Sequence, residues 1–288
     1  MKAIIIGIGN IGRWHFHSLA GSYKMVVFDK YPDVYTSLYK HIIEHKLMPE
    51  FEVVLRYMDL SPKIAEEDIV IISTTVDDRL SIFKNVIRKK PKAIILEKPA
   101  FKTLEEYEEA NNLTKNSNTQ VFVNLPRVYD PNYQKIRLLK GKISINSYYT
   151  TKTGLLCNLV HYVHLLDYLT GQPALLSTWE HIEVINSKRE GYKEVVGSLI
   201  CKTPNGGKLC VLRGGINEVN TTVHNKEQNE LFKYKETPCL VSNTTFQAVK
   251  EIVCGGQCSL PTLDDCYNAH KVLYEYMKNN SLNELRYT

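Results

Sequence analysis

The stretch of sequence that decides the fold is Ala3-Ile4-Ile5-Ile6-Gly7-Ile8-Gly9-Asn10-Ile11-Gly12. Four apolar residues are typical of a buried strand, and a GxGxxG pattern separates them from a helical pattern over 11–19. In this context Gly7 permits a tight turn, Gly9 lets the backbone approach a pyrophosphate, and Gly12 lets the helix pack close to the strand. The free N–H groups at the start of the helix would bind the phosphates of a dinucleotide.

An acidic residue ends the next predicted strand. Asp29 follows Met25-Val26-Val27-Phe28 and lies 20 residues beyond Gly9. A carboxylate at this place accepts hydrogen bonds from both ribose hydroxyls of NAD and repels the 2′-phosphate of NADP. The neighbouring Lys30 would soften that preference, so we expect NAD, with NADP as the alternative. A Rossmann-like domain that binds no dinucleotide is the competing interpretation.

Short apolar strands alternate with helical patterns over roughly the first 120 residues. Wholly apolar strands of this kind predict a parallel sheet that helices cover on both faces. The predicted strands are 3–6, 25–28, 69–72, 93–96 and 121–123, and the predicted helices are 11–19, 34–45, 80–87 and 104–113. We therefore expect an α/β Rossmann domain at residues 1–123.

The pattern changes after residue 123, where we expect an α+β domain at residues 124–288 that binds substrate and mediates oligomerisation. Strands are predicted at 182–184, 195–202, 208–212 and 231–235, and helices at 133–139, 155–169 and 263–277. Asn205-Gly206 between two apolar runs predicts a hairpin. Strands of this pattern favour an antiparallel sheet.

The composition excludes several classes of protein. Of the 288 residues, 43% are hydrophobic and 23% charged, which is typical of folded proteins rather than disordered ones. The sequence contains no apolar run of about 18 residues, so no membrane span is expected. The net charge of +5 is mild and spread along the chain, and basic runs such as Arg88-Lys89-Lys90 are short, which argues against a nucleic-acid partner. The first residues lack a signal-peptide pattern and the cysteines lack a CxxC motif, so we expect a cytoplasmic protein with reduced thiols.

Glu97-Lys98-Pro99 ends the predicted strand at 93–96, about 85 residues after the glycine turn. Together with that turn, it resembles the signature of the Gfo/Idh/MocA family of NAD(P)-dependent oxidoreductases. One further residue, His15, and three further stretches also resemble the family. The stretches are Val123-Asn124-Leu125-Pro126-Arg127, residues 154–171 and Leu260-Pro261-Thr262-Leu263. The resemblance thus runs over nearly the whole chain.

The resemblance implies a Rossmann domain followed by a domain with an open-faced mixed sheet. It also implies hydride transfer between nicotinamide and a secondary alcohol or ketone of a sugar, nucleotide-sugar or cyclitol. In the family, the lysine of Glu-Lys-Pro binds the reacting oxygen and a helix histidine exchanges its proton, and the matching residues here are Lys98 and His161. An ammonium stabilises a developing alkoxide, and a neutral imidazole accepts a proton near neutral pH.

The expected contacts follow from these patterns. The cofactor contacts are Gly7, Gly9, Asn10, Ile11, Gly12, Asp29, Lys30, Thr74, Thr75, Glu97 and Lys98. The substrate contacts are Lys98, Arg127, Asn158, His161 and His164.

The chain departs from the family around His161. Family members often carry an acid three or four residues before this histidine, where the chain has Asn158 and Cys157, and an Asp three residues after it, where it has His164. The missing acid removes an orienting partner of the imidazole. Two alternatives therefore stand beside the dehydrogenase. One is a catalytically silent regulatory protein that binds a dinucleotide or sugar on the same fold, and the other is a biliverdin-reductase-like enzyme.

Two further expectations concern metals and assembly. His161 and His164 would share a helix face, but no third ligand follows at a firm spacing, so no metal site is expected. An open apolar sheet face is a liability in solution. We therefore expect a homodimer or homotetramer.

Overall fold

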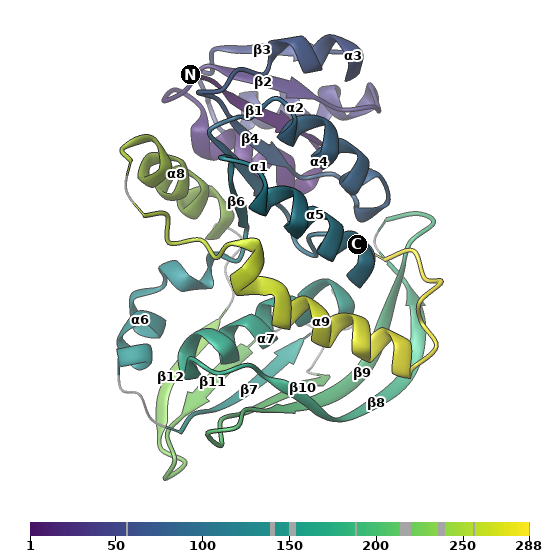
Figure 1. Ribbon diagram of the computed structural model, residues 1–288, viewed down its shortest axis with the longest axis vertical. Coiled ribbons are helices and arrows are strands. Elements are labelled where there is room, and N and C mark those ends of the chain that lie inside the picture. The colour runs from purple at the N-terminus through teal and green to yellow at the C-terminus, as the bar shows by residue number, and fades with distance from the viewer. Residues whose placement is uncertain are drawn as a thin grey trace. The chain divides into compact units, whose positions relative to one another are not determined.

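The computed structural model describes residues 1–55, 57–138, 142–149, 154–187, 189–213, 220–235, 240–255 and 257–287. The chain divides into two compact units, shown in Figure 1. The first unit is Met1–Asn124 with Pro238–Asp264, and the second is Leu125–Thr237 with Asp265–Thr288. The sequence analysis placed 238–264 in the second domain. In the structure α8 (Leu240–Val253) packs against α1 (Asn10–Leu19), so this segment lies in the first unit.

A parallel sheet with the strand order β3-β2-β1-β4-β5-β6 forms the centre of the first unit (Figure 1). Its strands are β1 Ala3–Ile6, β2 Met25–Phe28, β3 Phe51–Val54, β4 Ile69–Ile72, β5 Ala93–Leu96 and β6 Gln120–Val123. This is the order of a doubly wound Rossmann sheet, whose ligands bind beyond the carboxyl ends of the strands where the order reverses, between β1 and β4. The predicted parallel sheet is confirmed.

Full burial explains why these strands read as continuous apolar runs. Every residue of β1, β2, β4 and β5 is buried, because helices cover the sheet. Besides α1 and α8, the helical segments of this unit are α2 Asp33–Glu44, α3 Tyr57–Leu60, η1 Ser61–Lys63, η2 Val76–Asp78, α4 Arg79–Ile87 and α5 Leu104–Lys115. The edge strand β3 is only partly buried and was not predicted.

The second unit contains a mixed sheet with the order β12-β11-β7-β10-β9-β8. Its strands are β7 Ser144–Tyr149, β8 Leu175–Asn186, β9 Lys193–Lys202, β10 Lys208–Arg213, β11 Asn220–His224 and β12 Glu230–Lys235. β7 and β10 pair in parallel, and the other neighbouring strands pair antiparallel. The mixed sheet is confirmed, and so is the hairpin at Asn205-Gly206, which joins β9 to β10 with Gly206 at φ +87°.

The helices of this unit are η3 Pro126–Tyr129, α6 Pro131–Leu138, α7 Leu156–Thr170 and α9 Leu263–Asn279, the last of which begins in the first unit. α7 packs on β7, β9 and β10. Strand register places the buried residues of the sheet in rows, one of which joins Leu199, Val211, Ser147 and Thr221 across four strands. Within the described ranges, every helix is too short or too polar to reach across a lipid bilayer.

Candidate active site

The glycine turn after β1 is built so tightly that side chains do not fit. Gly7 has φ +92°, and a Cβ on it would lie 2.7 Å from the backbone nitrogen of Thr74. A Cβ on Gly12 would lie 2.0 Å from the carbonyl oxygen of Gly7. Ser73 Oγ donates a hydrogen bond of 2.6 Å to the same carbonyl. The turn therefore brings α1, which begins at Asn10 and Ile11 directly after Gly9, close to the ends of β1 and β4.

Asp29 closes this turn from the end of β2. Its Oδ2 accepts a hydrogen bond of 2.8 Å from the backbone N–H of Ile8, and its Oδ1 accepts one of 3.0 Å from that of Tyr31. The carboxylate is thus fixed beside the glycine turn, where a ribose would meet it. Lys30 forms an ion pair with Asp78, which offsets the positive charge next to Asp29.

Thr74 and Thr75 follow β4, the neighbour of β1 in the sheet. The hydroxyl of Thr74 is buried and hydrogen-bonds to no described residue. The backbone around it is fixed by Arg79, a buried residue that the sequence analysis did not select. Its guanidinium donates to the carbonyl oxygens of Thr74 and Pro99, and to that of Glu97 at 2.5 Å. Arg79 thereby ties the end of β4 to the end of β5.

Glu97 is a buried carboxylate at the end of β5. His15 Nε2 lies 3.0 Å from its Oε1, and the side-chain amide of Asn124 donates to the same oxygen. Burial alone would raise the pKa of Glu97, but the hydrogen bond and charge of His15, the charge of Lys98 and the bond from Asn124 hold this pKa below its ordinary value of 4.5. Because a carboxylate only accepts hydrogen bonds, His15 Nε2 carries a proton.

The other ring nitrogen of His15 lies 2.8 Å from the hydroxyl oxygen of Thr245 on α8. The imidazole of His15 therefore links the Glu97 carboxylate to α8, which lies 148 residues later in the sequence at Thr245. Lys98 follows Glu97 directly, is partly exposed, and precedes a cis peptide bond to Pro99. Glu97, Lys98, Asp29 and the glycine turn all lie at the carboxyl ends of strands of one parallel sheet.

The second unit carries the other predicted substrate residues, mostly on α7. His161 is partly exposed, whereas Asn158 is buried and its Nδ2 donates to the carbonyl of Gly154 at 3.4 Å. His164 is only 6% exposed, and burial lowers its pKa to about 4, with Asp265 opposing this shift and Arg127 adding to it. The ring of His164 is therefore neutral near pH 7 and lies inside the unit, which leaves it little surface for a substrate.

Arg127 is also buried, and its guanidinium lies over the ring of Tyr162 at 4.7 Å from the ring centroid. Of the predicted substrate residues, Lys98 and His161 are thus the two with partly exposed side chains. Lys98 belongs to the first unit and His161 to the second. Their joint action on one substrate stays a prediction.

A buried carboxylate that the sequence analysis missed lies at the start of α7. Glu194 on β9 accepts a hydrogen bond of 3.1 Å from the backbone N–H of Cys157. A Cβ on Gly154 would lie 1.6 Å from Glu194 Oε2, so the glycine makes room for the acid. This acid comes from a strand, whereas the acid expected from the family resemblance would lie on the helix itself.

The match to a known family lies in the first unit. Residues 1–125 match the model of the Gfo/Idh/MocA family, described as an oxidoreductase family with an NAD-binding Rossmann fold. The first 125 residues are thus similar to the NAD-binding Rossmann domain of that family. The matching family domain is described as NAD-binding. The glycine turn fits that cofactor, because it leaves no room for a Cβ at Gly7 or Gly12.

Solved structures share the fold of this chain over both units. One is scyllo-inositol dehydrogenase from Lactobacillus casei with bound NAD(H) and scyllo-inositol, at 16% identity and a TM-score of 0.71, covering 97% of each chain. Another is UDP-N-acetylglucosamine 3-dehydrogenase from Acidithiobacillus ferrooxidans, at 11% identity and 0.70, covering 99% of each chain. A third is a dehydrogenase from Clostridium difficile, at 14% and 0.70, covering 97% of this chain and 99% of that one.

Identities this low show the shared fold and no more. No sequence among the curated proteins matches this chain. The substrate must therefore be argued from the site itself.

Proposed function

We propose that this protein is an NAD-dependent dehydrogenase or reductase that acts on a secondary alcohol or ketone of a sugar, nucleotide-sugar or cyclitol. The observation that carries the proposal is the edge of the parallel sheet in the first unit. There the glycine turn, the fixed carboxylate of Asp29 and the Glu97-Lys98 pair all follow the carboxyl ends of strands. The substrate class is supported by the likeness in fold to inositol and UDP-N-acetylglucosamine dehydrogenases.

The glycine turn 7–12 and Asp29, here called the cofactor cradle, bind the dinucleotide in this proposal. The first N–H groups of α1 bind the pyrophosphate, and the Asp29 carboxylate accepts hydrogen bonds from the adenosine ribose. The ion pair between Lys30 and Asp78 leaves Asp29 as the dominant charge beside that ribose, which favours NAD over NADP. Bound NAD supplies the acceptor or donor of the hydride.

Lys98 and His161 have the two polar tasks of the reaction. The Lys98 ammonium donates a hydrogen bond to the reacting oxygen and stabilises the negative charge that develops on it. His161 accepts the proton of the alcohol, or returns it in the reverse direction. Glu97 acts through Lys98 rather than on the substrate, because it is buried and bonded to His15 and Asn124.

The proposal is tested by following NADH absorbance with NAD and a panel of myo-inositol, scyllo-inositol, UDP-N-acetylglucosamine and their ketones. With the best substrate, Lys98→Met and His161→Asn should each lower kcat/KM by about 10²–10⁴-fold, the usual loss on removing an electrostatic or acid–base group. The matched controls are Lys89→Met and His224→Asn, which should retain wild-type activity.

Two results would contradict the proposal. A His161→Asn variant with wild-type turnover would end the assignment of the proton acceptor. Tight NAD binding by calorimetry, with no turnover of any member of the panel, would favour the catalytically silent regulatory protein.

A further inference from the structure

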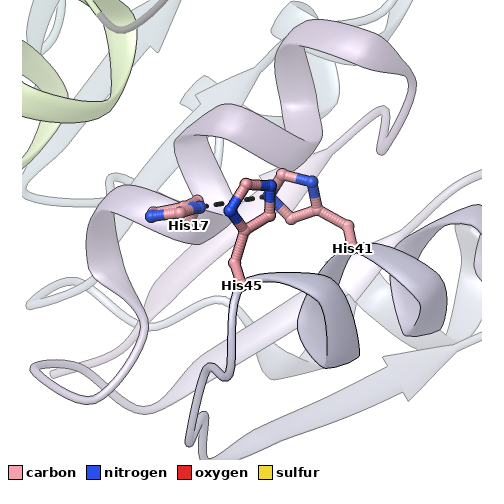
Figure 2. Close-up of side chains that lie close together, drawn as sticks. All are labelled: His17, His41 and His45. Atoms are coloured by element: carbon pink, nitrogen blue, oxygen red, sulfur yellow. Dashed lines mark hydrogen bonds between the residues drawn. The ribbon is translucent and has the colours of Figure 1, made fainter.

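Three histidines of the first unit converge outside the cofactor cradle. His17 comes from α1, His41 from α2, and His45 directly follows α2 (Figure 2). One nitrogen of each ring lies within 4.8 Å of one nitrogen of each of the other two. Among the residues that the structure describes, these three form the single group of three or more His, Cys, Asp or Glu side chains close enough to hold a metal ion.

Local structure explains how the rings meet. His41 and His45 are four residues apart, so they share one side of the helix end, and the backbone N–H of His45 donates 3.1 Å to the carbonyl of His41. His17 Nδ1 and His41 Nε2 share a hydrogen bond of 3.2 Å, whose proton an ion bound between them would displace. Two nitrogens that bind one tetrahedral zinc ion at 2.0–2.1 Å are about 3.4 Å apart, so this pair already has the spacing of two ligands.

The third ligand needs only a small movement. His45 is exposed, while His17 is partly buried and His41 is buried. An exposed ring at a helix end rotates at little cost. The ligand atoms lie at most 4.8 Å apart, so the distance from His45 to the other two must shorten by at most about 1.4 Å to reach the ligand spacing. The exposure of His45 also leaves a fourth position open to water, as in zinc sites with three protein ligands.

One aromatic side chain borders the three rings. Trp14 packs against all three rings, with centroid distances of 5.1–5.5 Å, and supplies an apolar wall to the cluster.

We propose that His17, His41 and His45 form a binding site for a divalent transition-metal ion, with zinc as the best-fitting ion. Imidazole suits zinc, copper and nickel, whereas calcium and magnesium require oxygen ligands, which this cluster lacks among the described side chains. The bound ion joins α1, which follows the glycine turn, to the end of α2, which follows Asp29. It thereby stabilises the cofactor-binding unit. The proposal departs from the sequence analysis, in which only His161 and His164 were considered as a metal pair and no metal site was expected.

The test measures binding of ZnCl2 to the full-length chain by calorimetry and the Tm by thermal unfolding. Cys254→Ser and Cys258→Ser are included in every protein so that thiols do not compete for the ion. We expect one zinc ion per chain, a Tm higher by about 5 °C or more at a hundredfold excess over Kd, and no shift with MgCl2 or CaCl2. His45→Asn should weaken zinc binding by about 100-fold or more. In the absence of zinc its Tm should equal that of the wild type, because the side chain is exposed.

A second readout uses Trp14. In a Trp179→Phe background Trp14 is the remaining tryptophan, and NiCl2 or CuCl2 should quench its fluorescence. The variants that bind zinc more weakly should also need more nickel or copper for this quenching. His17→Asn should abolish the quenching, and His224→Asn should leave it unchanged. Equal zinc affinity in wild type and His45→Asn, or a Tm that zinc does not raise, would show that the cluster is an aromatic packing group without a metal.

Discussion

Glu97 carries a negative charge in the interior of the first unit because two donors meet on one of its oxygens. His15 and Asn124 both bond to Oε1, and together with Lys98 they outweigh the cost of burying the charge. A charged acceptor makes each of these bonds stronger than a neutral one. The carboxylate therefore fixes the end of β5, where Lys98 is attached.

Glu97→Gln removes this charge and keeps the shape of the side chain. We expect the free energy of unfolding at pH 7 to fall by about 1–2 kcal/mol, the difference between a charged and a neutral acceptor. A lowered pKa in the folded state stabilises the protein above the unfolded value of 4.5, and this contribution is lost as the pH falls below it. The gap between wild type and Glu97→Gln in urea unfolding should therefore shrink from pH 7 to pH values below about 4.5. A gap that stays constant would mean that Glu97 is not charged in the folded protein.

Gly12→Ala tests the tightness of the glycine turn. The added Cβ would meet the Gly7 carbonyl oxygen at 2.0 Å, so backbone must move although alanine favours helix. We expect a loss of about 1–3 kcal/mol in stability and at least a tenfold weaker Kd for NAD by calorimetry. Gly171→Asn is the matched control, because nothing lies within 4 Å of its Cβ position and asparagine tolerates the left-handed backbone at φ +65°. Equal losses in both variants would contradict the steric argument.

The sequence located residues whose place depends on their own backbone position, and their tasks stay predictions. Gly7, Asp29 and Lys98 lie just beyond strand ends, where ligands of a parallel sheet bind, and Gly12 lies in the first turn of α1. Partners that meet only through tertiary packing were not predictable. Arg79 bonds to carbonyls 18 and 20 residues away, and Glu194 reaches the start of α7 from 37 residues away.

At the scale of elements, prediction succeeded where burial was uniform. The buried strands β1, β2, β4 and β5 and the helices α1 and α7 lie within a residue or two of their predicted bounds. Polar sequence hid three strands. β3 is an edge strand with Glu52 in it, β7 reads Ser-Ile-Asn-Ser-Tyr-Tyr, and β11 reads Asn-Thr-Thr-Val-His. In β7 and β11 the polar residues Ser147 and Thr221 are buried because they hydrogen-bond to each other at 3.0 Å.

α8 was also missed, and its attachment to α1 makes a testable point. Thr245 pairs with His15 at 2.8 Å, and the backbone N–H of Phe246 donates to Ser18 Oγ at 2.8 Å. Thr245→Val leaves the buried His15 Nδ1 without this hydroxyl, so we expect a loss of about 1–3 kcal/mol in urea unfolding. Thr245→Ser restores the hydroxyl and should recover most of the loss. Equal stability of Thr245→Val and Thr245→Ser would show that the hydrogen bond between His15 and Thr245 does not anchor α8.

The whole chain is organised as two units that it enters more than once. It passes from the first unit to the second after Asn124, returns at Pro238, and leaves again after Asp264. A sequence reading that looks for one linker cannot find such a return. The pattern of wholly apolar strands followed by mixed ones nevertheless predicted which sheet is parallel and which is not.

The sheet of the second unit leads to the last prediction, which concerns assembly. On one side of this sheet the row Leu199, Val211, Ser147 and Thr221 is buried. On the other side Ile200, Cys210, Leu212 and Tyr148 are only partly covered, and Tyr148 is 37% exposed. Partly exposed apolar residues on neighbouring strands are typical of an interface between subunits.

We therefore predict a homodimer or homotetramer that buries this side of the sheet, measured by light scattering at micromolar concentration. Tyr148→Arg places a charge in the middle of the predicted interface and should shift the protein to monomers with its secondary structure intact, because a buried unpaired charge is strongly disfavoured. Leu138→Arg on α6 is the control, since Leu138 is 78% exposed and lies off the sheet, so it should leave the assembly unchanged. A monomeric wild type would refute the prediction, and a Tyr148→Arg oligomer would place the interface on another surface.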